Sequence, residues 1–135
     1  MRLSIAIPAF NERPPLPLVI EKVERALEHP FLRTSGIQPG IIVVDDGSTD
    51  GTRAWLRDLD PATIHVVLRQ RSEGKGAALA EGSSRARGES VLIQGADLEY
   101  DPRDDPVLLA PILEADADVV FGRRFLGGAH RVLYY

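Results

Sequence analysis

Short runs of aliphatic and β-branched residues alternate along this chain with stretches of helical character. The runs lie at residues 3–7, 41–44, 64–68, 90–94 and 118–121. Strands that alternate with helices predict a parallel sheet, because right-handed crossover connections carry the helices onto its faces. The uninterrupted apolar run at 41–44 favours a central strand that is covered on both faces. We therefore predict an α/β fold with a mostly parallel, twisted sheet and helices on both faces.

The intervals between these runs contain helical patterns. Helices are predicted at residues 16–28, 52–59, 76–87 and 105–113. In the first of them, Val19, Ile20 and Val23 recur at the spacing of one helical face. Pro111 predicts a kink or a break in the last one, because an interior proline removes a backbone hydrogen bond. Residues 29–40 are expected to form a surface loop.

Size and composition limit the possible functions. The chain has 135 residues, 44% of them hydrophobic, which is enough for one compact domain. Its 16 basic and 20 acidic residues give a net charge of -4, which argues against nucleic acid as a partner. Because the chain has no cysteine, a metal would have to bind oxygen or imidazole ligands. It shows no signal peptide and no apolar run long enough to cross a bilayer, so a cytoplasmic location is expected.

Unusual residues follow each predicted strand. In an open parallel sheet, ligands bind beyond the carboxyl ends of the strands. The segments at these ends are PAFNE at 8–12, DDGSTDG at 45–51, EGKG at 73–76, GADLE at 95–99 and GRR at 122–124. Consecutive crossovers would bring these segments to one edge of the sheet, where we expect the functional site.

Two acidic segments have alternative interpretations. Asp45 and Asp46 have the composition of an ordinary turn and helix cap, but adjacent carboxylates after a buried strand need hydrogen-bond donors. A nucleobase N–H or a ribose hydroxyl would supply such donors. Asp97 and Glu99 form either a solvated acidic loop or a site for Mg²⁺ or Mn²⁺, which prefer oxygen ligands and add water and substrate phosphates to them.

Cationic residues near the same edge also have two interpretations. The GKG turn at 74–76 is either a flexible turn or a cradle for phosphate oxygens, with Lys75 adding charge. The turn lacks the spacing of P-loop and dinucleotide-binding motifs. Arg123, Arg124 and Arg131 serve either surface solubility or phosphate binding, for which guanidinium groups are well suited.

Taken together, these segments resemble the motifs of one known family, the family-2 glycosyltransferases of the GT-A fold. The segments are SIAIPAFNE at 4–12, IIVVDDGSTDGT at 41–52, GKGAAL at 74–79, ADLEYDP at 96–102 and VVFGRRF at 119–125. They follow the order of the family's motifs and cover nearly the whole chain. The resemblance extends to the dolichol-phosphate mannose synthases and the bacterial polyprenyl-phosphate glycosyltransferases. It implies the Rossmann-like, nucleotide-binding half of the GT-A fold.

The resemblance also implies an activity, the inverting, metal-assisted transfer of a hexose from a GDP- or UDP-sugar to a polyprenyl phosphate. Nucleotide-sugar binding would involve Pro8, Phe10, Glu12, Asp45, Asp46, Lys75, Ala96 and Asp97. Asp97 and Glu99 would hold Mg²⁺ or Mn²⁺. Asp97 and Arg124 would be the catalytic residues, while Arg124 and Arg131 would bind the acceptor phosphate. Such an enzyme would work at the cytoplasmic membrane face.

The chain departs from the family pattern at several positions. Gly95 replaces the first aspartate of the D-x-D metal motif, which predicts weaker metal binding. Phe10 replaces the usual tyrosine, and Arg123 replaces a serine. Family members continue beyond residue 135, so we expect a single nucleotide-sugar-binding domain over 1–135, shortened at its C-terminus, with an uncovered sheet edge that favours self-association. The alternative function is a truncated or degenerate nucleotide-binding module without catalytic activity.

Overall fold

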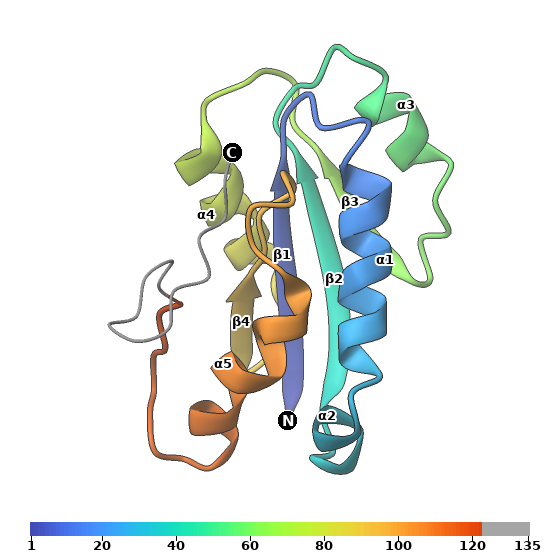
Figure 1. Cartoon of the computed structure of the whole chain (residues 1–135). Coiled ribbons are helices and arrows are strands. Elements are labelled where there is room, and N and C mark those ends of the chain that lie inside the picture. Colours follow the sequence, from blue (N-terminus) through green and yellow to red (C-terminus); the bar gives the residue numbers. More distant parts are fainter. Residues whose placement is uncertain (123–135) are drawn as a thin grey trace.

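Four parallel strands form the central sheet of the computed structural model, which describes residues 1–122 (Figure 1). They are β1 (Arg2–Ala9), β2 (Gln38–Asp45), β3 (Ile64–Leu68) and β4 (Ser90–Ile93), in the spatial order β3-β2-β1-β4. Each strand pairs in parallel with its neighbours, so that Ile5 of β1 lies opposite Ile41 of β2 and Leu92 of β4. The predicted parallel α/β sheet is thereby confirmed.

Helices cover both faces of this sheet. Within the described residues they are α1 (Leu16–Leu27), α2 (Pro30–Thr34), α3 (Thr52–Arg57), α4 (Lys75–Arg85) and α5 (Asp105–Leu113). Helices α1, α3 and α5 lie on one face and α4 lies on the other (Figure 1). Over residues 1–122, none of them has the length and apolar character needed to cross a bilayer.

The central strands are buried on both sides. Ile5 and Val43 pack with Val19 of α1 in the larger core, whereas Val44 packs with Ala78 of α4 on the opposite face. Successive side chains of a strand point to opposite faces, so the uninterrupted apolar run of β2 supplies both cores. The central, doubly covered strand that the sequence predicts is therefore β2.

The predicted fifth strand is wrong. Residues 118–121 form no strand, and Phe121 is 86% exposed. A short apolar run does not form a strand by itself, because its backbone N–H and C=O groups need a neighbouring strand with which to pair. Within residues 1–122, the sheet therefore ends at β4.

The predicted surface loop at 29–40 is wrong in part, because it contains helix α2. The His29 Nδ1 accepts a hydrogen bond from the Phe31 N–H at 3.2 Å, and Pro30 occupies the first turn. A side-chain acceptor just before a helix and a proline in its first turn both favour a helix start. Strand β2 then begins at Gln38, within the segment that was expected to be loop.

Pro111 does not break helix α5. The helix continues past it to Leu113, so the missing N–H removes a single hydrogen bond near the C-terminal end. The chain then turns back, and the Pro111 carbonyl accepts hydrogen bonds from the N–H groups of Asp116 and Ala117 at 2.9 and 3.1 Å. The expected split at Pro111 is therefore wrong, because one helix runs past the proline and ends shortly after it.

Candidate active site

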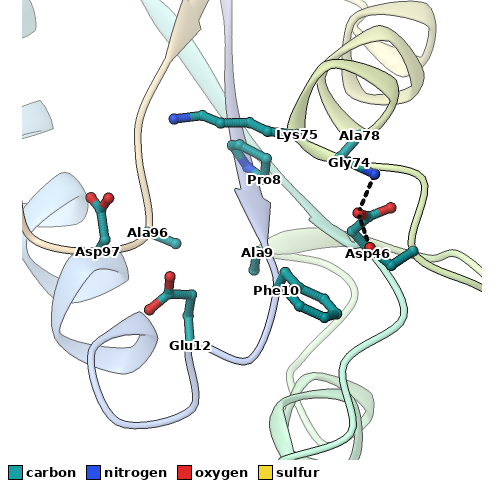
Figure 2. A pocket seen from close by; sticks show the side chains of 11 residues that line it. Pro8, Ala9, Phe10, Glu12, Asp46, Gly74, Lys75, Ala78, Ala96 and Asp97 are labelled. Atoms are coloured by element: carbon teal, nitrogen blue, oxygen red, sulfur yellow. Dashed lines mark hydrogen bonds between the residues drawn. The ribbon is translucent and has the colours of Figure 1, made fainter.

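A pocket of about 270 Å³ opens beyond the carboxyl ends of the strands (Figure 2). Its lining residues are Pro8, Ala9, Phe10, Glu12, Asp46, Ser72, Gly74, Lys75, Ala78, Ala96 and Asp97. Pro8 and Ala9 are the last residues of β1, Lys75 and Ala78 belong to α4, and the others come from the loops that follow β1, β2, β3 and β4. The structure therefore brings together four of the five segments in which the sequence predicts the site.

All but one of the residues expected to bind a nucleotide-sugar line this pocket. The exception is Asp45, which is 0% exposed and is not part of the lining. Glu99 is not part of the lining, and its N–H donates to the Asp97 Oδ1 at 3.2 Å. The predicted roles of Arg124 and Arg131 fall on residues outside the described part of the chain, so they stay predictions.

The buried Asp45 carboxylate is paired within the protein. Its Oδ2 lies 2.9 Å from Nε of Arg53, a residue of α3, and its Oδ1 accepts the Ser48 N–H at 3.3 Å. Arg53 also donates to the main-chain carbonyl of Arg69. Desolvation of the carboxylate is thus offset by an ion pair and hydrogen bonds. This pairing fixes the start of the loop that follows β2.

Asp46 is held by the loop that follows β3. Its carboxylate accepts hydrogen bonds from the Ser72 hydroxyl at 2.9 Å and from the N–H groups of Glu73 and Gly74 at 3.2 and 3.0 Å. Arg69 adds an ion pair, with Nε 3.3 Å from Oδ1. Burial alone would raise the pKa of Asp46, but these donors and the Arg69 charge together lower it below the usual value. The carboxylate is therefore ionised.

These contacts show which groups satisfy the adjacent carboxylates of Asp45 and Asp46. The sequence indicates that Asp45 and Asp46 need donors, and the protein itself supplies donors to both carboxylates. The arginines that provide the charge, Arg53 and Arg69, were not among the predicted site residues. A signal was available, since two adjacent buried carboxylates require nearby cations and an arginine occurs early in the next predicted helix and just after the next predicted strand.

The loops that follow β1 and β2 are joined side by side. The Asn11 N–H donates to the Ser48 Oγ at 2.9 Å, and the Thr49 N–H donates to the Asn11 Oδ1 at 2.8 Å. Asn11 adopts a left-handed conformation with φ of 52°, which its short polar side chain tolerates. The neighbouring Phe10 is 47% exposed and offers an aromatic surface to the pocket. This side of the pocket is thus fixed by hydrogen bonds before any ligand binds.

Charged groups gather on the other side of the pocket. Glu12 and Asp97 lie across from Lys75, whose side chain extends over the pocket in Figure 2. Burial, followed by the negative charges of Asp97 and Asp50, raises the pKa of Glu12. Within residues 1–122, Lys75 makes no ion pair. This part of the pocket therefore presents two carboxylates and, within the described residues, an ammonium group without an ion pair.

The donor set suits a divalent cation that is shared with phosphate oxygens. Residues 1–122 contain no group of three or more acidic, histidine or cysteine side chains placed to hold a metal alone. A Cβ at Gly95 would lie 3.1 Å from the Asp97 Oδ1, a tight contact, so the glycine leaves that carboxylate uncrowded. Mg²⁺ commonly binds through one or two carboxylates plus substrate phosphates. Asp97, with Glu12 facing it, meets that requirement only when a phosphate ligand is present.

A polar pocket beyond the carboxyl ends of a parallel sheet lies where open α/β proteins bind their ligands. The model of glycosyl transferase family 2 matches residues 4–135, and the chain belongs to this family. The family and the solved structures described below confirm the α/β GT-A fold that the motifs predict.

Two curated relatives are similar in sequence to nearly the whole of this chain. The polyprenol monophosphomannose synthase of Mycolicibacterium smegmatis is 38% identical over 133 residues, which cover 94% of this chain. The dolichol-phosphate mannosyltransferase of Pyrococcus furiosus is 30% identical over 129 residues, which cover 95% of this chain. The chain spans 46% of the length of the first relative and 34% of the second.

Two solved structures are similar over most of the chain. S. aureus TarS in complex with UDP has a TM-score of 0.66 and 22% identity, and the match covers 87% of this chain and 34% of TarS. The mannosyltransferase PcManGT of Pyrobaculum calidifontis, in complex with GDP-Man and Mn²⁺, has a TM-score of 0.53 and 30% identity. That match covers 76% of this chain and 29% of PcManGT.

Proposed function

We propose that residues 1–135 form a single domain that binds a nucleotide-sugar and serves the transfer of a hexose to a polyprenyl phosphate. The observation that carries this proposal is the pocket, where loops after all four strands meet beside an aromatic surface, a lysine and two facing carboxylates. The names of the curated relatives, which are polyprenyl- and dolichyl-phosphate sugar transferases, support the choice of acceptor.

The nucleoside would bind on the preformed side of the pocket. Phe10 offers a ring face on which a base can stack, and Pro8 and Ala96 line the pocket beside it. Asp45, which is buried and outside the lining, would act indirectly, by holding the loop after β2. A pocket whose walls are already joined by hydrogen bonds loses little conformational entropy when it binds a ligand.

The diphosphate would bind on the charged side. Lys75 supplies an ammonium group there, and the first turn of α4 has no side-chain cap, so its N–H groups are available to phosphate oxygens. Asp97 and Glu12 would hold a divalent cation jointly with those oxygens, and Glu99 would assist from the adjacent loop. When bound, the cation would stabilise charge that develops on the departing nucleoside diphosphate.

The transfer step forms one bond and breaks one. An oxygen of the acceptor phosphate attacks the anomeric carbon of the hexose, the bond from that carbon to the diphosphate oxygen breaks, and the nucleoside diphosphate leaves with the electron pair. A phosphate monoester carries more than one negative charge near neutral pH, so the attacking oxygen needs no general base. As the family resemblance implies, Arg124 and Arg131 would bind the acceptor phosphate.

Transfer of radiolabelled sugar tests the proposed function. The full chain is incubated with GDP-mannose or UDP-glucose, Mn²⁺ and a polyprenyl phosphate, and the lipid fraction is counted. Incorporation that requires both lipid and Mn²⁺ is the expected result. If nucleotide binds but no sugar is transferred, the activity assigned to this chain is wrong.

One observation favours a second candidate, a nucleotide-binding module without catalytic activity. Gly95 leaves the metal with one carboxylate fewer than the family motif provides. Calorimetry with GDP and UDP, with and without Mn²⁺, separates this candidate from an enzyme when it is combined with the transfer assay. Tight nucleotide binding together with no transfer identifies the module.

A further inference from the structure

One buried carboxylate holds the loop that follows β3 against the pocket. Asp46 accepts hydrogen bonds from Ser72, Glu73 and Gly74, and Arg69 pairs with it. Arg69 also reaches the far side of the loop, where a terminal guanidinium nitrogen lies 3.1 Å from the Glu73 carboxylate. We call these five residues the Asp46 network.

The Asp46 network ends at the residue that precedes Lys75. Gly74 donates its N–H to Asp46 at 3.0 Å and has φ of 98°, a conformation that glycine adopts without strain. Helix α4 begins at the next residue, Lys75, whose side chain extends over the pocket (Figure 2). The direction of that side chain therefore depends on a turn that Asp46 fixes.

Arg69 suits this arrangement better than another cation would. Its side chain is 14% exposed and is not part of the pocket lining, so it does not touch a ligand there. Its planar fork reaches Asp46 and Glu73 together, whereas a lysine ammonium would act as a single point charge. Its charge also neutralises Asp46, which would otherwise repel a bound diphosphate.

We propose that Arg69 is a positioning residue that acts through the Asp46 network to hold Lys75 and the start of α4 against the donor diphosphate. The inference rests on the proposed function, because it presupposes that a nucleoside diphosphate binds in this pocket. Arg69 is not part of the pocket lining, so its effect on a bound nucleotide would be indirect.

The first test compares nucleotide affinity with stability. Dissociation constants for GDP and UDP in the presence of Mn²⁺ are measured by calorimetry for the wild type and for Arg69→Met, well below each melting temperature recorded by circular dichroism. Arg69→Met is expected to weaken binding about tenfold, the effect of losing one charge-assisted contact. Arg85→Met is the control, because it removes the same charge from the end of α4 that is remote from Lys75 and breaks only the exposed pair with Glu81. It should leave the dissociation constants unchanged.

The second test asks whether the effect passes through Lys75. In a double-mutant cycle, Arg69→Met should weaken binding by less than about twofold when Lys75→Met is already present, because neighbouring residues that act together are not additive. If Arg69→Met does not fold, Arg69→Lys replaces it and should weaken binding severalfold. An unchanged dissociation constant in a folded Arg69 variant, or full additivity with Lys75→Met, overturns the inference and leaves the proposed function intact. If the wild type binds neither GDP nor UDP, the proposed function fails and the inference with it.

Discussion

Each of the two adjacent carboxylates at the end of β2 is neutralised by its own arginine. Asp45 pairs with Arg53 of α3, and Asp46 pairs with Arg69 just after β3. A buried ion pair is costly to form and more costly to break, because the remaining charge is left without a partner. Loss of either arginine would therefore disturb the loops around the pocket more than the loss of an exposed ion pair would.

At the scale of single residues, position 95 decides how strongly the site holds a cation. Gly95→Asp is expected to raise the affinity for Mn²⁺ in the presence of GDP by at least about tenfold, which is the scale on which changes around a metal alter its binding. The physical reason is that a second carboxylate would be added beside Asp97, whose side chain must shift by a few tenths of an ångström because the new Cβ would lie 3.1 Å from its Oδ1. Mn²⁺ electron paramagnetic resonance or calorimetry measures the change. Gly95→Ala fills the same space without a carboxylate and should give no increase; an increase with alanine, or none with aspartate, would mean that Asp97 is not a ligand.

Asp105 makes the stability of the chain depend on pH. It is 3% exposed, and its Oδ2 has no hydrogen-bond partner in the described structure. Burial, and then the charges of Asp104 and Asp101, raise the pKa of Asp105 to about 7. The pKa of an aspartate in the unfolded chain is about 4. Because the folded chain binds the proton more tightly, the free energy of unfolding falls as pH rises from about 4 to the folded pKa. The total fall is no more than about 4 kcal/mol.

Asp105→Asn tests this dependence. The variant should be more stable than the wild type above pH 7 and should lose most of the decline in the free energy of unfolding between pH 4 and pH 7, measured by urea denaturation. Asp104→Asn, at an exposed neighbouring position, should keep most of that decline. Equal slopes for the wild type and Asp105→Asn would show that the carboxylate ionises without cost.

At the scale of elements, two loops approach one another at a glycine. Gly47, after β2, has φ of 80°, and a Cβ there would lie 2.8 Å from the Ser72 main-chain nitrogen. Gly47→Ala is expected to lower the free energy of unfolding by about 2–4 kcal/mol, because backbone strain is added to a clash with main-chain atoms. Gly51→Ala is the control, since Gly51 also has a positive φ, of 93°, but an added Cβ would meet nothing within 4 Å.

Thermal and urea denaturation of these two variants separate the cost of backbone strain from the cost of the clash with main-chain atoms. Gly51→Ala should cost only about 1 kcal/mol, the strain of a left-handed alanine. If the two substitutions cost the same, the loops after β2 and β3 are not in contact in solution. A larger loss for Gly47→Ala, together with weaker nucleotide binding, would support the close approach of the two loops.

The elements themselves were predicted with unequal success, for physical reasons. The bounds of β3 are those predicted, because an apolar run flanked by polar residues defines them. β1 and β2 extend further than their apolar runs. They begin at Arg2 and Gln38, which pair with each other at the N-terminal ends of the two strands. The apolar run at 118–121 was predicted as a strand but forms none. A strand needs a neighbouring strand with which its backbone can pair, and the run itself does not show whether one is present.

The candidate site was predicted in outline. Parallel crossovers bring loop ends to one edge, so the meeting of four segments followed from the strand pattern alone. Which side chains face the pocket did not follow, because Asp45 and Asp46 are consecutive and only the second lines the pocket. The sequence indicates that the two carboxylates need nearby cations, but it does not indicate which arginine pairs with which carboxylate, because Arg53 and Arg69 come from different elements whose spacing depends on the fold.

At the scale of the whole molecule, strand β4 is an edge of the described sheet. Val91 and Ile93 are exposed on it, and they alternate with Leu92, which packs on the core. An edge strand with exposed apolar residues pairs readily with another copy. The sedimentation coefficient of the chain is therefore expected to rise with concentration, and Ile93→Lys should reduce that rise. Val107→Lys, at an exposed position on α5, should not; equal behaviour of the two variants would contradict pairing through β4.

The contact between Arg13 and Trp55 has a practical consequence for studying this chain. The Arg13 guanidinium carbon lies 5.4 Å from the centre of the indole, and Trp55 is the sole tryptophan of the sequence. Arg13 directly follows Glu12, so any shift of that segment when a donor enters would change the surroundings of the indole. Intrinsic emission of the unlabelled chain is therefore a site-specific optical signal, with which donor entry can be followed in real time by stopped-flow mixing.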